Sequence, residues 1–260
     1  MIRRKKALWP GLLLAAFVTL AVAAPLVAPY PPEGLDLAHR REPPNASHWF
    51  GTDDLGRDVL ARILYGARVS LAVGLLSAAI AGVSGIAIGG AAGYAGGTID
   101  NVLMRLTDAM VSLPRLPLLM IAAAVLQPSI PLLVMLIGLA SWMETARVTR
   151  AECLSLVHRE FVDAARAVGA GHARLVAAHL LPNAAPAIIV SVTLAVGRGI
   201  LLESALSFFG VGVRPPQASW GNMLYQAQAT LGTEPWLALF PGLFIFLTAL
   251  SVNVAGDRTV

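Results

Sequence analysis

Long blocks of apolar residues alternate with polar segments along the 260-residue chain. Six such blocks are visible, at about 7–28, 69–92, 109–126, 129–148, 184–209 and 236–254. Blocks of about 18 or more apolar residues are typical of helices that cross a bilayer, because a helix satisfies its backbone polar groups internally. The pattern therefore predicts an all-α integral membrane protein with about six transmembrane helices.

The first block follows a cluster of four basic residues within 1–6. A cleaved secretory signal begins in a similar way. The block is about 22 residues long, however, which exceeds the apolar region of a typical signal and is enough to span a bilayer. We therefore favour a retained helix over a signal peptide, and either interpretation keeps the basic end in the cytoplasm.

Three further blocks have features that affect helix geometry. The third contains Pro114, Arg115 and Pro117, so we expect a bent span whose arginine faces protein or water. The strongly apolar part of the fourth, 131–143, is short, so this helix is expected to continue into the cytoplasm. Glycines recur every four residues in and just after the second block, which predicts a face that another helix approaches closely. These glycines are Gly85, Gly89, Gly93 and Gly97.

The polar segment 29–68 precedes the second block and is rich in proline at its start. Thr52 or Asp53 can cap a helix. Apolar residues recur after them with helical spacing, at Val59, Leu60, Ile63 and Leu64. We expect a loop that leads into an amphipathic helix lying at the outer membrane surface.

Composition agrees with membrane embedding, since 57% of the residues are hydrophobic and 13% are charged, whereas soluble domains carry about 25% charged residues. The formal net charge is +4, but the basic residues are spread among acidic ones, which does not indicate nucleic-acid binding. Cys153 is the only cysteine, so neither an internal disulfide nor a cysteine metal cluster is expected. The histidines show no metal-ligand spacing, and they are His39, His48, His158, His172 and His179.

The distribution of lysine and arginine predicts the orientation. With the amino end inside, the inner segments contain eleven of these residues and the outer segments six, in the sense of the positive-inside rule. The inner segments are 1–6, 93–108, 144–182 and 255–260, and the outer ones are 29–68, 127–128 and 210–235. Both termini are then cytoplasmic. We divide the chain into the first helix and external segment, 1–68, a transmembrane core, 69–254, and a short cytoplasmic tail, 255–260.

The cytoplasmic segment 144–182 is expected to form a short helix-turn-helix. Gly169 and Gly171 break its first helix, and Pro182 is expected to end the second, 172–181. The first helix presents an apolar knob made of Phe161, Ala164, Ala165 and Val168, with Asp163 and Arg166 beside it. An exposed apolar surface needs a partner to cover it. From the residues alone, an amphipathic hairpin that rests on the membrane surface is as well supported as a surface that binds a partner protein.

Several motifs resemble those of one transporter family. The pattern Asp163-Ala164-Ala165, then Gly169, then His179-Leu180-Leu181-Pro182 resembles the EAA motif of permease subunits of ATP-binding-cassette importers. Asp163 stands where the motif has glutamate, and His179 where isoleucine is common. Three further segments, in the same order along the chain, resemble the second permease of dipeptide, oligopeptide and nickel importers. They are 51–58, 208–216 and 219–224.

The resemblance implies a type I importer permease fold in the plasma (inner) membrane. The implied partners are a homologous permease, two ATPase subunits, an external substrate-binding protein and membrane lipid. The implied contact with the ATPase is a coupling helix that comprises Phe161, Asp163, Ala164, Ala165, Val168 and Gly169. ATP and Mg²⁺ would bind the ATPase subunits, so this chain needs no cofactor of its own. The implied cargo is a di- or oligopeptide, with nickel or another small solute as the alternative.

Two other classes of function are less favoured. A proton-coupled secondary transporter needs buried titratable groups, and Glu203 is the one that we identify. A membrane-embedded enzyme needs a cluster of nucleophile, base and orienting group, which we do not find, and the sequence has no G-x-x-x-x-G-K-[ST] phosphate-binding loop. Arg198 and Glu203 lie in the same span. We favour the interpretation that they pair at the end of the span, near interfacial water, or that they contact a sister subunit. The alternative is a pore-lining pair that touches the substrate or gates water.

Overall fold

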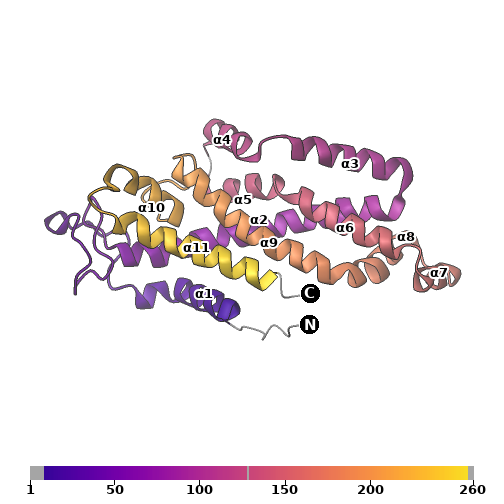
Figure 1. Ribbon diagram of the computed structural model, residues 1–260, viewed down its shortest axis with the longest axis horizontal. Helices are drawn as coiled ribbons and strands as arrows, with labels where there is room; N and C mark the ends of the chain where they lie inside the picture. Colours follow the sequence, from indigo (N-terminus) through magenta and orange to yellow (C-terminus); the bar gives the residue numbers. More distant parts are fainter. Residues whose placement is uncertain (1–8, 128, 257–260) are drawn as a thin grey trace.

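The computed structural model describes residues 9–127 and 129–256, which form an elongated bundle of helices without a β-strand (Figure 1). The α-helices are α1 (Trp9–Val27), α2 (Val59–Ala95), α3 (Gly97–Ser112), α4 (Arg115–Leu126), α5 (Ile130–Leu139), α6 (Trp142–Leu156), α7 (Glu160–Ala167), α8 (His172–Arg174), α9 (Leu181–Phe208), α10 (Trp220–Ala227) and α11 (Trp236–Gly256). Short 3-10 helices cover Leu37–His39 and Gln228–Thr230, and a π-helix covers Leu175–Leu180. The basic start, 1–6, and the tail beyond Gly256 lie outside the described residues.

Four helices are long and apolar enough to cross a membrane by themselves, namely α1, α2, the continuous helix His172–Phe208 and α11. Two bent pairs reach this length only together, α3 with α4 at 80° and α5 with α6 at 41°. The described residues therefore contain up to six spans, in agreement with the predicted number. Both predicted irregularities are confirmed, since Pro114 lies at the break before α4 and α6 extends the fourth span to Leu156.

Helix α2 runs through the bundle, and α6 packs directly on its glycine face (Figure 1). A Cβ atom at Gly85 would lie 2.8 Å from the carbonyl oxygen of Trp142, and one at Gly93 would lie 2.7 Å from that of Arg150. The predicted face thus lets the two helix backbones touch. Gly97 does not belong to it, because α2 ends at Ala95 and Gly97 begins α3.

The separate amphipathic helix expected before the second span is absent from the described external segment, and this expectation is wrong. Residues 59–68 are the first turns of α2. Asp58, rather than Thr52 or Asp53, caps the helix by accepting a hydrogen bond from the backbone N–H of Ala61. The helix continues because apolar residues of these turns share a core with α10 and α11; they are Val59, Ile63 and Ala67.

Pro182 does not end a helix, contrary to the expectation from sequence. Helix α8, the π-helix and α9 form one continuous helix, His172–Phe208. In the π-helical turn the backbone N–H of Leu181 bonds to the carbonyl of Val176, five residues back. This wider turn accommodates a proline, which has no N–H to donate. The predicted helix-turn-helix is therefore α7 followed by the helix His172–Phe208, which also forms the fifth span.

Large apolar side chains cover much of the outer surface, as expected where lipid replaces water. Val22, Leu26, Val83 and Val125 are each at least 70% exposed. The two ends of the molecule differ from this belt. Helix α7 lies at one end of the long axis, and the external segment lies with α10 at the other (Figure 1).

Candidate functional site

Helix α7 projects from one end of the bundle and ends in a turn built on Gly169 (Figure 1). Gly169 has a φ of +88°, in the left-handed region that glycine adopts without a steric penalty. Its N–H bonds to the carbonyl of Arg166, and the N–H of Ala170 bonds to the carbonyl of Ala165. These two hydrogen bonds form a Schellman motif, which closes the helix. The prediction that Gly169 ends this helix is confirmed.

Helix α7 buries one side and exposes the other. Val162 is the buried residue, with 0% of its surface exposed. Five of the predicted contact residues are exposed, namely Phe161, Asp163, Ala164, Val168 and Gly169. Ala165 differs from the expectation, because it is half-buried and packs against the core beneath the helix. The exposed apolar face therefore consists of Phe161, Ala164 and Val168.

A small core attaches α7 to the bundle. Val162 packs in one cluster with Cys153 of α6 and with Leu175 and Leu180 of the π-helix. The Tyr94 hydroxyl at the end of α2 also lies 2.5 Å from Nδ1 of His172, which begins α8. Helix α7 is thus tied to the ends of transmembrane helices and is not a free loop.

Two ion pairs hold α3 on α6. Arg150 donates from Nε and Nη2 to the two carboxylate oxygens of Asp100 at 2.5 and 2.6 Å. Arg147 Nη2 donates to Asp108 at 2.6 Å, in a pair that is more exposed to solvent. Each of these arginines therefore has a carboxylate of its own.

Glu144, in the first turn of α6, is shared by two arginines from other helices. Arg115 Nη2 of α4 donates to its Oε1 at 3.0 Å, and Arg198 Nη1 of α9 lies 2.5 Å from its Oε2. Arg198 therefore pairs with Glu144 and not with Glu203, so the pairing expected within the fifth span is wrong. Residues from three helices meet in one cluster, the Arg115–Glu144–Arg198 cluster.

Glu203 is completely buried and has a different role. Ser70 Oγ donates to its Oε2 at 2.9 Å, and Ser207 Oγ donates to its Oε1 at 2.8 Å. The two hydroxyl oxygens accept hydrogen bonds from the backbone N–H groups of Trp220 and Val213, respectively. Glu203 thereby holds the segment around α10 against α2 and α9. This network was not predicted from the sequence, although hydroxyl residues at apolar positions of two spans were the available signal.

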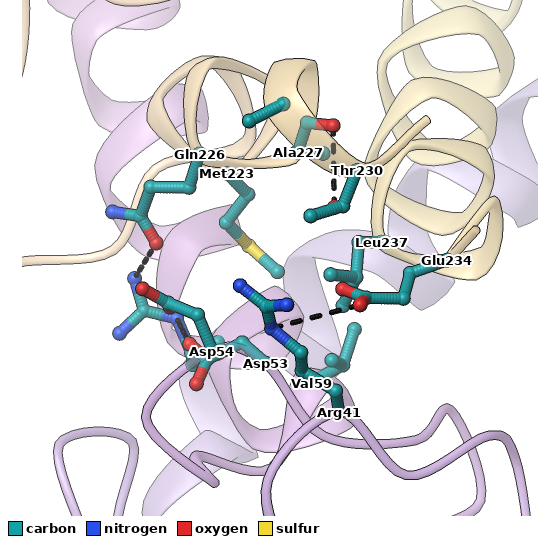
Figure 2. Close-up of a pocket in the computed structure, with 12 residues that line it drawn as sticks. Arg41, Asp53, Asp54, Val59, Met223, Gln226, Ala227, Thr230, Glu234 and Leu237 are labelled. Atoms are coloured by element: carbon teal, nitrogen blue, oxygen red, sulfur yellow. Dashed lines mark hydrogen bonds and ion pairs between the residues drawn. The ribbon is translucent and has the colours of Figure 1, made fainter. Parts of the chain in front are cut away.

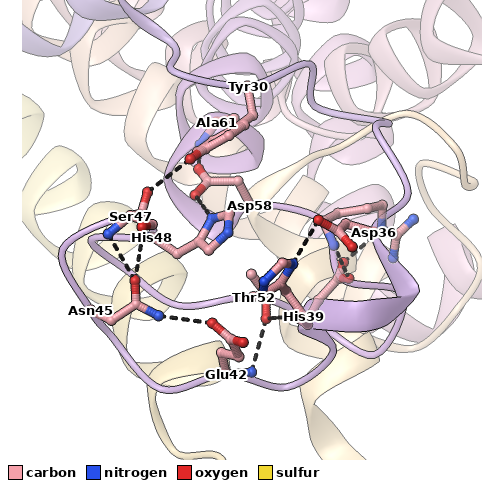
Figure 3. Close-up of polar contacts among 12 residues, drawn as sticks. Tyr30, Asp36, His39, Glu42, Asn45, Ser47, His48, Thr52, Asp58 and Ala61 are labelled. Carbon is pink, nitrogen blue, oxygen red and sulfur yellow. Dashed lines mark hydrogen bonds and ion pairs between the residues drawn. The ribbon is translucent and has the colours of Figure 1, made fainter.

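Hydrogen bonds among its own side chains fold the external segment between α1 and α2 (Figure 3). His48 Nδ1 lies 2.9 Å from Oδ2 of Asp58, the residue that caps α2. Thr52 Oγ1 donates to the carbonyl of His39, whose Nδ1 lies 2.8 Å from Oδ2 of Asp36. The hydrogen bond to this carboxylate raises the pKa of His39 above its ordinary value. The segment is therefore an ordered cap on one end of the bundle.

A polar cavity lies between this cap and the helices α10 and α11 (Figure 2). Arg57 donates from Nε to the buried Asp53 at 2.6 Å and from Nη2 to Gln226 of α10 at 3.1 Å. Arg41 Nε lies 3.6 Å from Oε1 of Glu234, just before α11. These contacts join the two outer segments that the sequence analysis defined into one surface.

Known proteins resemble the chain over nearly its full length. A family described as the inner membrane component of binding-protein-dependent transport systems matches residues 85–259. The dipeptide transport system permease protein DppC of Bacillus subtilis (strain 168) is 38% identical over 258 residues, which are 98% of this chain and 81% of that protein. The oligopeptide transport system permease protein OppC of the same strain is 35% identical over 256 residues, 98% of this chain and 84% of that protein. A putative peptide permease of Brucella suis biovar 1 (strain 1330) is 40% identical over 258 residues, 98% of this chain and 85% of that protein.

A solved structure has the same fold. It is an inward-facing conformation of the MetNI methionine ABC transporter, with a TM-score of 0.63, 19% sequence identity, and coverage of 76% of this chain and 94% of that chain. The similarity confirms the expected importer permease fold. Because the family match covers more than half of the chain and the relatives cover almost all of it, the chain belongs to the inner membrane components of binding-protein-dependent transport systems, the multi-pass permease subunits of ATP-binding-cassette importers.

Proposed function

We propose that the chain is the permease subunit of an ATP-driven importer of di- or oligopeptides and forms half of its translocation pathway. Relatives named as dipeptide and oligopeptide permeases match 98% of the chain, which supports peptides over other small solutes. The observation that carries the coupling role is the exposed apolar face of α7 on its buried anchor, Val162. A surface of this kind requires a partner.

The proposed assembly contains a second, homologous permease, two ATPase subunits and an extracytoplasmic substrate-binding protein. ATP and Mg²⁺ bind to the ATPase subunits, which also perform the hydrolysis. Helix α7 and both chain termini face the cytoplasm, a placement supported by α1 beginning and α11 ending toward the α7 end of the bundle (Figure 1). The outer segments 29–68 and 210–235 receive the binding protein.

Coupling follows from the attachment of α7. When the two ATPases close on ATP, they draw the docked α7 helices together. Because Val162 joins α7 to α6 and to the helix His172–Phe208, the displacement moves these helices as rigid bodies and alternates the pathway between inward- and outward-facing states. The contact itself comprises Phe161, Asp163, Ala164, Ala165, Val168 and Gly169.

Ala164 offers the sharpest test of the contact, because it is exposed and a larger side chain there leaves the Val162 core intact. We expect Ala164→Arg to lower peptide uptake by the reconstituted transporter at least about tenfold, as for a central interface residue, with unchanged thermal stability. Ala173→Arg places the same charge on an exposed residue of α8 and is the control. Wild-type uptake by the Ala164→Arg transporter would contradict the docking role.

The contact can also be measured directly, because the only native cysteine, Cys153, is buried. An Ala164→Cys variant labelled with benzophenone-4-maleimide should photocrosslink to an ATPase subunit, because the benzophenone inserts into a nearby C–H bond, and an Ala173→Cys variant should do so less. Uptake of radiolabelled dialanine by the wild-type transporter tests the cargo separately. A transporter that takes up nickel and no peptide would refute the peptide assignment and leave the docking role standing.

A further inference from the structure

We propose that the Arg115–Glu144–Arg198 cluster binds the carboxylate end of the transported peptide. The inference rests on the proposed peptide import and names the residues of this chain that contact the cargo. The three side chains come from α4, α6 and α9 and meet only in the folded molecule. Four further properties of the cluster support an anionic ligand.

The first property is charge. Two guanidinium groups share one carboxylate, so the cluster carries one net positive charge. Arg198 Nε and Glu144 Oε2 are buried atoms without a hydrogen-bond partner among the residues that the structure describes, and Arg198 Nη1 holds Oε2 by an ion pair alone. By contrast, Arg147 and Arg150 each face a separate carboxylate. An unbalanced charge within membrane spans is expensive and typically marks a pathway for substrate or ions.

The second property is the position at helix breaks. Arg115 is the first residue of α4, after the 80° bend, and Glu144 lies in the first turn of α6, after the 41° bend. Discontinuous helices form the substrate sites of many transporters, because their N-termini carry partial positive charge and attract anionic groups. The helix N-termini at the two breaks therefore add to the positive electrostatic potential of the arginines.

The third property is space. An open groove of about 410 Å³ lies between α6 and α9, and its volume falls within the range of roughly 300–1,000 Å³ of small-molecule sites. Glu144 and Arg198 supply its charged groups, and Val148, Val190 and Leu194 supply an apolar wall. A dipeptide fits this arrangement, with its carboxylate on Arg198 and its side chains against the wall.

The fourth property is the opposing role of Glu144. It holds both arginines by ion pairs, and its negative charge also weakens the attraction for a peptide carboxylate. The site is therefore attractive and reversible, which suits a pathway that the cargo must leave. This opposition separates a ligand site from a purely structural ion pair, because the two roles predict different signs for the Glu144 substitution.

The test uses the assembled transporter in lipid nanodiscs and the photoreactive dipeptide alanyl-(p-benzoyl-phenylalanine). Mass spectrometry maps the labelled residues, and the peptide concentration at half-maximal labelling measures affinity. We expect labelling of the wall at Val148, Val190 or Leu194. Arg198→Gln should raise the half-maximal concentration about tenfold, the value of one charge-assisted hydrogen bond, and Glu144→Gln should lower it. Arg198→Lys keeps the charge but not the forked donors, so it should raise the half-maximal concentration less than Arg198→Gln does.

The C-terminal amide of the same dipeptide is the matched probe, because it lacks the negative charge. We expect it to label the wild type and the Arg198→Gln variant equally weakly. Weaker labelling in both the Glu144→Gln and Arg198→Gln variants would make the cluster structural and overturn the proposal. Unchanged labelling in both variants would also overturn it. Loss of the second permease from the purified Arg198→Gln complex would overturn it too, because Arg198 would then belong to the contact between the permease subunits. Dialanine uptake by the wild type decides the proposed function independently.

Discussion

Gly89 and Gly90 are neighbours on α2, and the bundle uses them differently. A Cβ atom at Gly89 would overlap the backbone of Ala146, whereas the nearest atom to one at Gly90 would be a Leu181 methyl at 3.7 Å. The first position therefore sets the distance between α2 and α6. The second position has room for a methyl group, and glycine there only lowers the helix propensity.

The two glycines allow a matched test of this packing. Gly89→Ala should destabilise the protein by about 1–3 kcal/mol, because the added methyl group separates packed backbones. Gly90→Ala should leave the stability unchanged or raise it by up to about 1 kcal/mol, the difference in helix propensity. Thermal unfolding in detergent compares them. Equal melting temperatures for the two variants would show that the α2–α6 contact does not depend on glycine.

A second pair of glycines separates backbone conformation from packing. A Cβ atom at Gly169 or at Gly171 would have open space around it, but Gly169 has a φ of +88° and Gly171 a φ of −71°. Any cost at Gly169 therefore comes from the backbone alone.

Gly169→Ala should weaken the end of α7 by about 1–2 kcal/mol, the penalty of a left-handed residue with a side chain. Hydrogen exchange of the Gly169 and Ala170 amides should then be about fivefold faster or more, because these amides make the closing hydrogen bonds. Gly171→Ala should leave exchange in α7 unchanged. Slow exchange in the Gly169→Ala protein would mean that the turn tolerates another conformation.

At the scale of the element, α6 connects three other helices through charges spaced three residues apart. Glu144 contacts α4 and α9, and Arg147 and Arg150 contact α3. The spacing places all three on one helix face, but their environments differ. The Asp100 pair of Arg150 is bidentate and partly buried, whereas the pair of Arg147 is about half-exposed.

Exchange of arginine for lysine distinguishes the two pairs, because lysine keeps the charge and loses the bidentate geometry. Arg150→Lys should reduce the stability of the α3–α6 contact by about 1–2 kcal/mol, and Arg147→Lys by less than about 0.5 kcal/mol. Limited tryptic proteolysis at Arg105 of α3, together with thermal unfolding, measures the difference. A larger effect at Arg147 would contradict this assignment.

At the scale of the whole molecule, α7 and the external cap lie at opposite ends of the long axis (Figure 1). Two helices of 37 residues, α2 and His172–Phe208, run between the two ends. Each is about 55 Å long at 1.5 Å per residue, against a hydrocarbon core of about 30 Å. Asp58 joins the first to the cap, and Val162 joins the second to α7. Long rigid helices therefore connect the proposed ATPase contact to the cap at the other end of the molecule.

Much of the architecture could be predicted from the sequence, because it depends on local chemistry. The lengths of the apolar blocks predict the spans, Pro114 predicts a break, and the four-residue glycine spacing predicts close packing. Gly169 predicts the end of α7, because glycine readily adopts the left-handed conformation that closes a helix. The exposed face of α7 was found from its helical periodicity, apart from the half-buried Ala165.

Only the tertiary structure decided the rest, because it depends on contacts between residues far apart in the sequence. Residues 59–68, whose pattern predicts a separate amphipathic helix, form the first turns of α2 because they pack against α10 and α11. A π-helical turn before Pro182 lets the helix continue through this proline. Glu144 lies more than 50 residues from its partner Arg198, and Ser70 lies 133 residues from Glu203. By itself the sequence determined a helical membrane protein of up to six spans and the exposed apolar face of α7. Three-dimensional packing decided which charged and hydroxyl groups meet, because most polar groups removed from water pair with whatever partner the fold brings near them.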